Sequence, residues 1–453
     1  MAGTGVGIGQ VSLVALAIAL IHCSRDHSVV VSALGFSVIG FAVTDALISR
    51  CGPSFIKIGL FGKDMSKIGK PVLPEAIGAV SAMVYIMIMF FYIPFIFYRY
   101  MVLDTVGGGD RNTSVEMNGW SKSSFPHNKL SEYLSSVLCL ESTIVLGIFD
   151  DLFDLRWRHK FPLPAIAAIP LLLVYYVDFG VTYVLVPNFA KDLFQGKTLV
   201  DLGVGYYGYM AAMAIFCPNS INILAGVNGL EVGQSIVLAS LSLINDLLYL
   251  TMGNESSRDS HLFSAVLIIP FLGVSSALYK WNRWPAKVFV GDTYCYFAGM
   301  VFAVVGILGH FSKTMLMLFI PQILNFIYSC PQLFNIVTCP RHRLPKFNEK
   351  DGLLYTSRVN LKENPPKRVF VPVLRILHFC KLIDLETDQD GTLVSCSNMT
   401  LINLVLVWFG PMREDKLCQL ILKLQFAIGL LSLFGRHAVG AILFGHDNLW
   451  TIS

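Results

Sequence analysis

The stretch YLSSVLCLESTIVLGIFDDLFDLRWRHK, residues 133 to 160, joins an apolar segment to a dense cluster of charges. The part before residue 150 is predominantly apolar without strict alternation, which predicts a membrane-spanning helix and not a strand of a barrel. The last twelve residues hold three carboxylates and three fixed cations. The chain therefore leaves the membrane at a point rich in charges of both signs.

Apolar runs separated by polar loops recur along the whole chain. The 453 residues are 54% hydrophobic and 14% charged, whereas soluble domains have about 25% charged residues. This composition predicts an all-α polytopic membrane protein, and nothing in it predicts a nucleic-acid partner. We expect ten membrane helices, near residues 28 to 48, 77 to 97, 133 to 149, 162 to 178, 204 to 224, 230 to 250, 261 to 279, 293 to 310, 314 to 330 and 417 to 435.

The distribution of Lys and Arg predicts which loops face the cytosol. Alternating the sides from the first of these spans puts about 23 of the 34 basic residues on one side and about 10 on the other. The richer side is the cytosolic one by the positive-inside bias, and it includes residues 150 to 161 and 331 to 416. The N-terminus then faces the lumen or exterior, as the C-terminus does, if residues 7 to 22 do not span the membrane.

The chain divides into four parts by this pattern. Residues 1 to 27 are an extension whose apolar portion could be a short span, a targeting segment or, as we favour, a luminal or interfacial helix. Residues 28 to 330 hold helices one to nine with their cytosolic loops. Residues 331 to 400 form a cytosolic segment that predicts a small β-β-α-β-β element, and residues 401 to 453 hold the last helix.

Three N-x-S/T sequons are present. Asn112 and Asn254 fall in loops assigned to the lumen and are candidates for glycosylation. Asn398 falls on the cytosolic side, and we expect it to stay unmodified. The ten cysteines form no CxxC pair and predict no disulfide framework.

The charged cluster has two interpretations. Asp150 and Asp154, spaced i and i+4, would share one face of a continuous helix, with Asp151 about 100° away. Carboxylates this close together favour a neighbouring cation, which Arg156, Arg158 or Lys160 could supply. The alternative is a solvated loop with snorkelling cations.

Other cytosolic-side segments carry related chemistry. NSINILAGVNGLE, residues 219 to 231, places Asn222, Asn228 and Gly226 within apolar spans, where polar groups mark a site or pathway unless they only join helices. WNRWPAKVFVGDTYCYFAG, residues 281 to 299, sets Phe289 and Asp292 at the start of a span, where the carboxylate could instead be a simple helix cap.

Two basic segments complete the set. CPRHR, residues 339 to 343, offers two guanidiniums suited to phosphate oxygens, or else a positive-inside stop signal. LFGKDMSKIGKPVLPEAIG, residues 60 to 78, adds lysines and Glu75, although such a segment can simply lie on anionic lipid. Carboxylates, amides, cations and an aromatic on one side predict Mg²⁺-assisted transfer of a phosphate-bearing group.

These segments resemble a known family. FDDLFDLRWRHK, NILAGVNGLE, VFVGDTYCYFAGM, CPRHR, LPE and VGILGHFSKTM are similar to motifs of the polyprenyl-phosphate N-acetylhexosamine-1-phosphate transferases, and specifically of the eukaryotic enzymes that use UDP-N-acetylglucosamine (UDP-GlcNAc) and dolichyl phosphate. The similarity extends from about residue 28 to the end. It implies ten membrane helices in the endoplasmic reticulum and an active site on the cytosolic face. The implied products are dolichyl-diphosphate-GlcNAc and UMP, in the first step of lipid-linked oligosaccharide synthesis for N-glycosylation.

The resemblance also implies roles for matched positions. Asn222 and Asp292 match the Mg²⁺ ligands, and the pair Asp150 and Asp151 matches aspartates essential for turnover. Lys160 matches a lysine near the transferred phosphates. The positions that match substrate contacts are Met65, Glu75, Gly226, Asn228, Phe289, Arg341, His342 and Arg343.

Among these substrate positions, Phe289 matches the aromatic that stacks on uracil. Gly226, Asn228 and Glu75 match residues around the base and the ribose. Arg341 matches the diphosphate contact, which makes it a candidate catalytic residue, while His342 and Arg343 match groups that read the sugar. The resemblance further implies inhibition by tunicamycin and allows a homodimer.

Two other functions are compatible with parts of the pattern. A secondary transporter would also place Asn, Asp and Glu within the membrane, but it predicts an internal repeat, which the sequence lacks. A nonenzymatic scaffold for later glycosyltransferases would tolerate loss of Asp292. We expect direct displacement at the β-phosphorus of UDP-GlcNAc by dolichyl phosphate, with a covalent aspartyl route as the second option.

Overall fold

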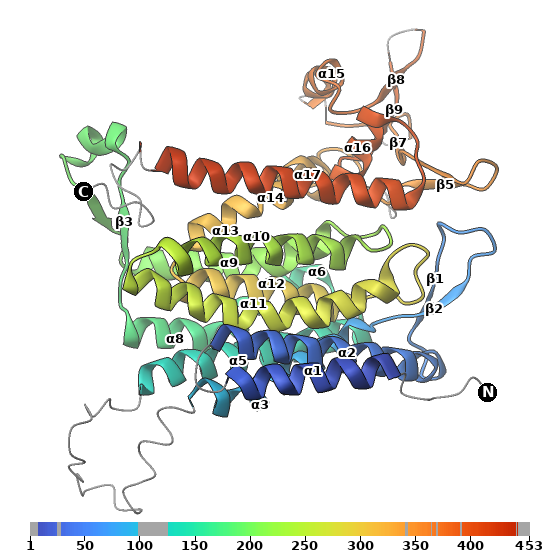
Figure 1. Ribbon diagram of the computed structural model, residues 1–453. Helices are drawn as coiled ribbons and strands as arrows, with labels where there is room; N and C mark the ends of the chain where they lie inside the picture. Colours follow the sequence, from blue (N-terminus) through green and yellow to red (C-terminus); the bar gives the residue numbers. More distant parts are fainter. Residues whose placement is uncertain are drawn as a thin grey trace, which may run out of the picture.

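The protein is a bundle of long helices with small sheets at its two ends (Figure 1). The computed structural model describes residues 8–24, 29–97, 126–339, 343–363, 365–367, 370–389, 392–440 and 442. The helices of the bundle are α1 (Ile8–Ser24), α2 (Val29–Lys57), α3 (Gly78–Ile96), α5 (His127–Phe153), α7 (Leu163–Ala167), α8 (Ile169–Asp178), α9 (Val204–Ile223), α10 (Leu230–Met252), α11 (Glu255–Asn282), α12 (Asp292–Leu308), α13 (Ser312–Leu318), α14 (Ile320–Leu333) and α17 (Glu414–Phe434).

Six helical segments of the described residues are long and apolar enough to cross a membrane. They are Val29–Lys57, Gly78–Ile96, Arg158–Asp178, Leu230–Met252, Glu255–Asn282 and Glu414–Val439. The bent pair α13 and α14 would make a seventh. The chain is therefore a mostly helical, polytopic membrane protein, and the count of ten spans stays a prediction.

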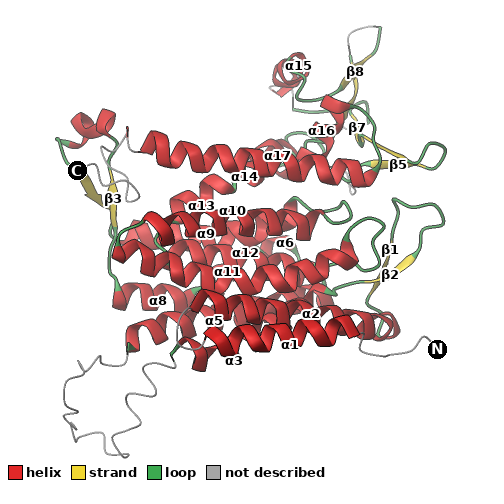
Figure 2. Cartoon of the chain, in the orientation of Figure 1, coloured by secondary structure: helices red, strands yellow, loops and turns green. Residues whose placement is uncertain are grey.

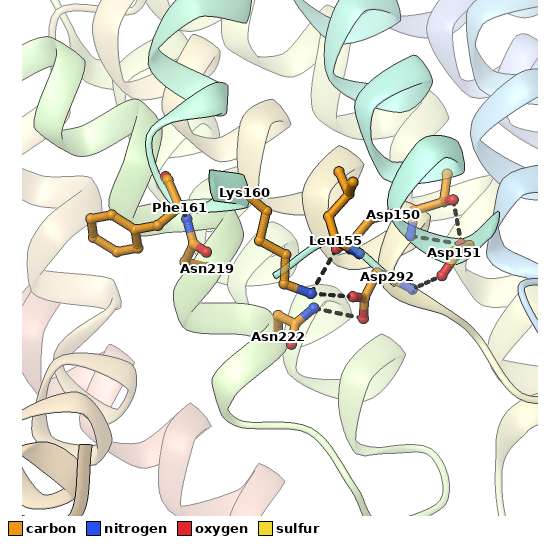
Figure 3. Close-up of polar contacts among 9 residues, drawn as sticks. Asp150, Asp151, Leu155, Lys160, Phe161, Asn219, Asn222 and Asp292 are labelled. Atoms are coloured by element: carbon orange, nitrogen blue, oxygen red, sulfur yellow. Dashed lines mark hydrogen bonds and ion pairs between the residues drawn. The ribbon is translucent and has the colours of Figure 1, made fainter. Parts of the chain in front are cut away.

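Helix α12 occupies the centre of the bundle. Every residue from Thr293 to Leu308 is buried, and the helix packs against both α5 and α9. Because α12 is surrounded by protein and not by lipid, it can be shorter than the helices around it. Its first residue is Asp292 (Figure 3).

The ninth expected span, residues 314 to 330, is not one straight helix. It is divided into α13 and α14, which meet at Phe319 with a bend of 66°. Pro321 lies in the first turn of α14, where its ring and missing N–H prevent α13 from continuing in the same direction. The apolar pattern could not reveal this break, because the sequence is equally apolar before and after the break.

Helix α1 lies along α2 within the bundle (Figure 1). A Cβ atom on Gly35 of α2 would come within 2.6 Å of the Ile21 side chain, so the glycine lets the two helices approach closely. Seventeen residues give α1 a length of about 25 Å, close to the hydrocarbon thickness. How this helix lies relative to the membrane stays a prediction.

The strands lie at the two ends of the bundle (Figure 2). At one end, β1 (Phe61–Lys63) pairs with β2 (Val72–Pro74). At the other, β3 (Tyr183–Leu185) pairs with β4 (Leu199–Asp201), with the 3-10 helix η1 (Asn188–Phe194) between them. The hairpin of β3 and β4 had not been predicted from the sequence.

The segment predicted to have the order β-β-α-β-β, residues 331 to 400, differs from that order by one strand. Its elements are β5 (Lys346–Asn348), β6 (Leu353–Tyr355), β7 (Arg358–Asn360), α15 (Val371–Phe379), β8 (Leu385–Thr387), β9 (Leu393–Ser397) and α16 (Leu401–Phe409). Strand β7 pairs with β9, which forms a three-stranded sheet of order β7-β9-β8, with Val359 opposite Cys396. A strand of three residues with so distant a partner has no local sequence signal.

Two of the three sequons lie among the described residues. Asn254 is exposed and caps α11, because its Oδ1 accepts from the backbone N–H of Ser257 at 2.9 Å. Asn398 is fully buried and bonded to Gln332 and Ser357, so it is inaccessible to modification in the folded protein. Asn112 lies outside the described residues, and occupancy of Asn254 stays a prediction.

The close packing of α9 and α12 yields a stability prediction. A Cβ atom on Gly299 would lie 2.3 Å from the backbone of Pro218, which cannot move independently of its helix. We expect Gly299→Ala to separate the helices and destabilise the protein by about 1 to 3 kcal/mol, seen as a lower Tm in detergent. Gly208→Ala on α9, where nothing lies within 4 Å of the new atom, is the matched control and should not lower the Tm. An unchanged Tm for Gly299→Ala would contradict this packing.

Candidate active site

A lysine between two aspartates forms the centre of the site (Figure 3). The Nζ atom of Lys160 lies 2.7 Å from Asp150 Oδ2 and 2.9 Å from Asp292 Oδ2. Lys160 comes from the short helix α6 (Trp157–Lys160), Asp150 from the last turn of α5 and Asp292 from the start of α12. Three segments of the sequence therefore meet at one ammonium group.

The chain reverses after Asp150 because of local hydrogen bonds. Helix α5 ends at Phe153, and Asp154 adopts the left-handed conformation with φ 46°. The buried Asp150 accepts from the backbone N–H of Leu155 at 3.1 Å, which brings the following segment back toward the site. The expectation that Asp150 and Asp154 share a helix face is therefore wrong: the helix ends before Asp154, whose side chain is exposed.

Asp151 caps the beginning of α12. Its Oδ1 accepts from the backbone N–H of Asp292 at 2.6 Å, and its Oδ2 accepts from the backbone N–H of Thr293 at 3.1 Å and from the Thr293 hydroxyl. The first N–H groups of a helix have no intrahelical acceptor, and a negative charge there is stabilised by the helix dipole. The sequence left open that Asp292 is only a helix cap. In the structure the cap is Asp151 from α5, and this cap positions Asp292.

Glycine is required where this cap forms. Gly291 has φ +80°, and a Cβ atom there would lie 2.6 Å from Ala76 Cα and 2.9 Å from Asp151 Oδ2. A side chain would therefore strain the backbone and displace the capping carboxylate. Gly291 thus lets the start of α12, the end of α5 and the segment before α3 come together.

Asn222 reaches the same aspartate from α9. Its Nδ2 donates to Asp292 Oδ1 at 2.7 Å, so both oxygens of Asp292 have partners. No group of three or more His, Cys, Asp or Glu side chains arranged to hold a metal is found in the described residues. A carboxylate and an amide oxygen, completed by substrate phosphates, are nevertheless a donor set that suits Mg²⁺. Asn222 would present Oδ1 to such an ion after its amide turns by 180°.

Glu75 and Phe289 lie beside this cluster. The backbone N–H of Phe289 donates to Pro74 O at 2.8 Å, and a Cβ atom on Gly62 would lie 3.0 Å from the Phe289 ring and 3.3 Å from Glu75 Oε2. Burial raises the pKa of Glu75, and the negative charges of Asp151 and Asp292 raise it further. Glu75 and Phe289 therefore share one neighbourhood, as expected from their matched roles.

Asn228 belongs to a second polar cluster. Its Nδ2 donates to Asp64 Oδ2 at 2.8 Å, and its backbone N–H donates to Glu414 Oε1 at 2.9 Å. Lys67 forms an ion pair with Glu414 and lies 3.5 Å from Asp64. The cluster joins the β1–β2 loop, the loop before α10 and the start of α17.

Of the remaining predicted positions, three lie among the described residues and two do not. Arg343 donates through Nη2 to Met399 O at 2.9 Å and not to the carboxylate cluster. Gly226 faces the side chain of Leu344, and Met65 is exposed on the β1–β2 loop. Arg341 and His342 lie outside the described residues.

Sequence reasoning missed the groups that position the others. Thr293 binds Asp151, while Asp64 and Glu414 hold Asn228. These residues lie in ordinary turns and helix starts and are far from their partners in the sequence. The one available signal was that Asp64 interrupts a run of lysines in an otherwise basic loop.

An apolar surface recess lies away from this chemistry. It is lined by Ile169, Leu172, Leu173, Tyr176, Val204 and Tyr207, between α8 and α9. Val204 begins α9, and Asn222 lies near its other end, about 27 Å along the helix. The recess is therefore separate from the carboxylate cluster.

Comparisons with known proteins agree with the site. The sequence model described as Glycosyl transferase family 4 matches residues 133–310. The chain is 72% identical over 441 residues to the UDP-N-acetylglucosamine--dolichyl-phosphate N-acetylglucosaminephosphotransferase of Saccharomyces cerevisiae, covering 97% of this chain and 98% of the relative. Proteins of the same name are 51% identical in Schizosaccharomyces pombe, covering 94% and 96%, and 38% identical in Dictyostelium discoideum, covering 95% and 93%.

Residues 133–310 contain the whole cluster of Asp150, Asp151, Lys160, Asn222 and Asp292. The similarity to the relatives also covers nearly the full length of both chains. The chain therefore belongs to the UDP-N-acetylglucosamine--dolichyl-phosphate N-acetylglucosaminephosphotransferase family, a group of membrane-bound phosphotransferases.

Proposed function

We propose that this enzyme transfers N-acetylglucosamine 1-phosphate from UDP-GlcNAc to dolichyl phosphate and releases UMP. The observation that carries the proposal is the Lys160 ammonium held between Asp150 and Asp292, in a family whose names specify these two substrates. The product is the lipid-linked sugar from which the oligosaccharide for N-glycosylation is built.

The reaction is a direct displacement. An oxygen of the dolichyl phosphate attacks the β-phosphorus of UDP-GlcNAc, and the bond from that phosphorus to the oxygen bridging the two phosphates breaks. UMP leaves with that oxygen and its electron pair. Lys160, and Arg341 by its matched position, stabilise the negative charge that develops on the phosphoryl oxygens. Asp150 orients Lys160 and the acceptor phosphate, which is kept as the dianion.

The hydrogen bonds of Asp151 favour direct displacement over a covalent aspartyl intermediate. Its two oxygens accept three hydrogen bonds at the start of α12, which lowers the nucleophilicity of the carboxylate. Its contribution is to fix the position of Asp292. The phosphate dianion of the acceptor is already a competent nucleophile, so the reaction does not need a nucleophile from the enzyme.

Asn222 and Asp292 would hold Mg²⁺ together with oxygens of the diphosphate. A bound Mg²⁺ supplies positive charge that stabilises the transferring phosphoryl group and the leaving phosphate. Asn222 fixes one carboxylate oxygen of Asp292 and Lys160 fixes the other. The aspartate is therefore already oriented before the substrate arrives.

The location follows from the acceptor. A dolichyl chain remains in hydrocarbon, so its phosphate meets the water-soluble nucleotide sugar where the bilayer and the cytosol touch. We infer that the enzyme crosses the endoplasmic reticulum membrane about ten times, with the cluster on the cytosolic face, where the Lys and Arg residues concentrate. A secondary transporter is less well supported, because transport would not require Lys160 to bridge Asp150 and Asp292 at the start of α12.

The proposed reaction predicts two products in equal amounts. Purified protein given UDP-GlcNAc, dolichyl phosphate and Mg²⁺ should form UMP and dolichyl-diphosphate-GlcNAc in a ratio of one to one. Chromatography of the nucleotide and the lipid measures both. If folded protein forms neither product, the proposal is wrong, and if it forms UMP without the glycolipid, the acceptor is wrong.

The proposed metal ligands predict a change in Mg²⁺ dependence. Asp292→Ala and Asn222→Ala each remove one ligand, so the Mg²⁺ concentration for half-maximal activity should rise by about tenfold or more. Asn219→Ala is the matched control, since Asn219 also lies on α9 but donates only to the carbonyls of Phe161 and Ile215. Unchanged Mg²⁺ titrations in both ligand variants would assign the metal to other residues.

The cap on α12 predicts a combined effect on stability and turnover. In Asp151→Asn, an NH₂ group replaces one acceptor oxygen and faces a backbone N–H, so the cap is partly lost. We expect a stability loss of about 1 kcal/mol and a kcat reduced by about tenfold or more because Asp292 shifts. Thermal unfolding and steady-state kinetics measure the two effects, and Asp154→Asn is the exposed control. Wild-type kcat and Tm in Asp151→Asn would refute this role for the cap.

A further inference from the structure

We propose that Asp64 sets the base specificity of the nucleotide site by fixing the direction of the Asn228 side-chain amide. The inference rests on the proposed function and on the family resemblance, which matches Asn228 to a residue beside the base. It adds a specificity-determining residue that does not itself touch the nucleotide.

Asp64 determines which end of the amide faces inward. A carboxylate offers only acceptors, so the group that it receives from Asn228 is the Nδ2 amino group, which lies 2.8 Å from Asp64 Oδ2. Asp64 is buried, with an exposed fraction of 4%. Turning the amide by 180° would place its carbonyl oxygen against the carboxylate, and neither atom could donate. Oδ1 is therefore the end that remains for a ligand, and no described residue donates to it.

The backbone of Asn228 is fixed as well. Its N–H donates to Glu414 Oε1, and Lys67 supplies a positive charge between Glu414 and Asp64. The next residue, Gly229, donates through its N–H to Asn282 Oδ1 at 3.1 Å. Asn228 is thus held by groups from the β1–β2 loop, α11 and α17, and the direction of its side chain cannot be adjusted by a shift of the loop.

The held amide lies in the neighbourhood of the aromatic ring. Asn282 donates to the carbonyl of Val288, the residue before Phe289. On the other side, a Cβ atom on Gly62, two residues before Asp64, would lie 3.0 Å from the Phe289 ring. The same two segments therefore carry the ring that would stack on a base and the amide that would meet its edge.

An outward carbonyl oxygen distinguishes uracil from cytosine. The N3 atom of uracil carries a hydrogen and donates, whereas the N3 atom of cytosine has a lone pair and accepts. Asn228 Oδ1 can accept a hydrogen bond from N3–H of uracil, but it would face the lone pair on N3 of cytosine. Because Asp64 prevents the amide from turning, the site cannot adapt to cytosine, and a buried polar mismatch of this kind is strongly disfavoured.

Direct binding of UMP and CMP to the purified full-length protein tests the inference. Isothermal titration calorimetry should show that wild type binds UMP at least about tenfold more tightly than CMP. In Asp64→Asn, residue 64 can donate or accept, so Asn228 can turn and the ratio of the two Kd values should fall several-fold. Glu414→Gln is the matched control in the same cluster. It keeps an acceptor oxygen for the Asn228 backbone, so both Kd values can rise while their ratio stays unchanged.

The outcomes separate this inference from the proposed reaction. A wild-type ratio in folded Asp64→Asn would overturn the inference, and so would equal binding of UMP and CMP by wild type. If Asp64→Asn does not fold, Asp64→Ala is measured in its place. Equal binding of UMP and CMP by wild type would still overturn the inference. Failure of the proposed reaction would be recognised separately, as the absence of glycolipid and UMP in the transfer assay.

Discussion

The bridge from Asp150 through Lys160 to Asp292 is the interaction on which the rest of the site depends. The Asp150 side chain is 1% exposed, so its charge requires a partner at the edge of the membrane. Removing one member of a buried ion pair typically costs about 3 to 5 kcal/mol because it leaves an uncompensated charge. The bridge thereby ties the end of α5 and the start of α12 to the short helix α6. In the proposed reaction, the same ammonium group stabilises the charge on the phosphoryl oxygens.

The position of α12 connects this bridge with the fold. The helix is buried along almost its whole length, and its first turn is held by Asp151 from α5 and Asn222 from α9. Because α12 packs between those same helices, the core of the bundle and the geometry of the site are fixed together. The close contact of Gly299 with Pro218 holds α12 against α9 further along the helix. A site built at helix ends is only as exact as the packing of the helices behind it.

Much of the site could be predicted because its residue types are costly in a membrane. Asn222 and Asp292 interrupt apolar runs, and such interruptions mark functional positions. The grouping with Asp150, Asp151 and Lys160 is confirmed by direct contacts. The continuous helix through Asp154 was wrong, because a left-handed residue leaves no signature in the apolar pattern. Strand β7 and the bend before α14 were missed, since both arise from partners or backbone geometry that a local pattern does not encode.

The sequence by itself determined the helical membrane architecture, the side on which charges gather and the chemical classes of the site groups. These follow from the transfer of side chains between water and lipid, which depends on each segment alone. Only the tertiary structure decided that Asp151 caps a helix from another part of the chain, that Lys160 joins two aspartates and that Asp64 directs Asn228. Those facts depend on distances between segments that are remote in sequence, and such distances are set by packing and by hydrogen-bond geometry.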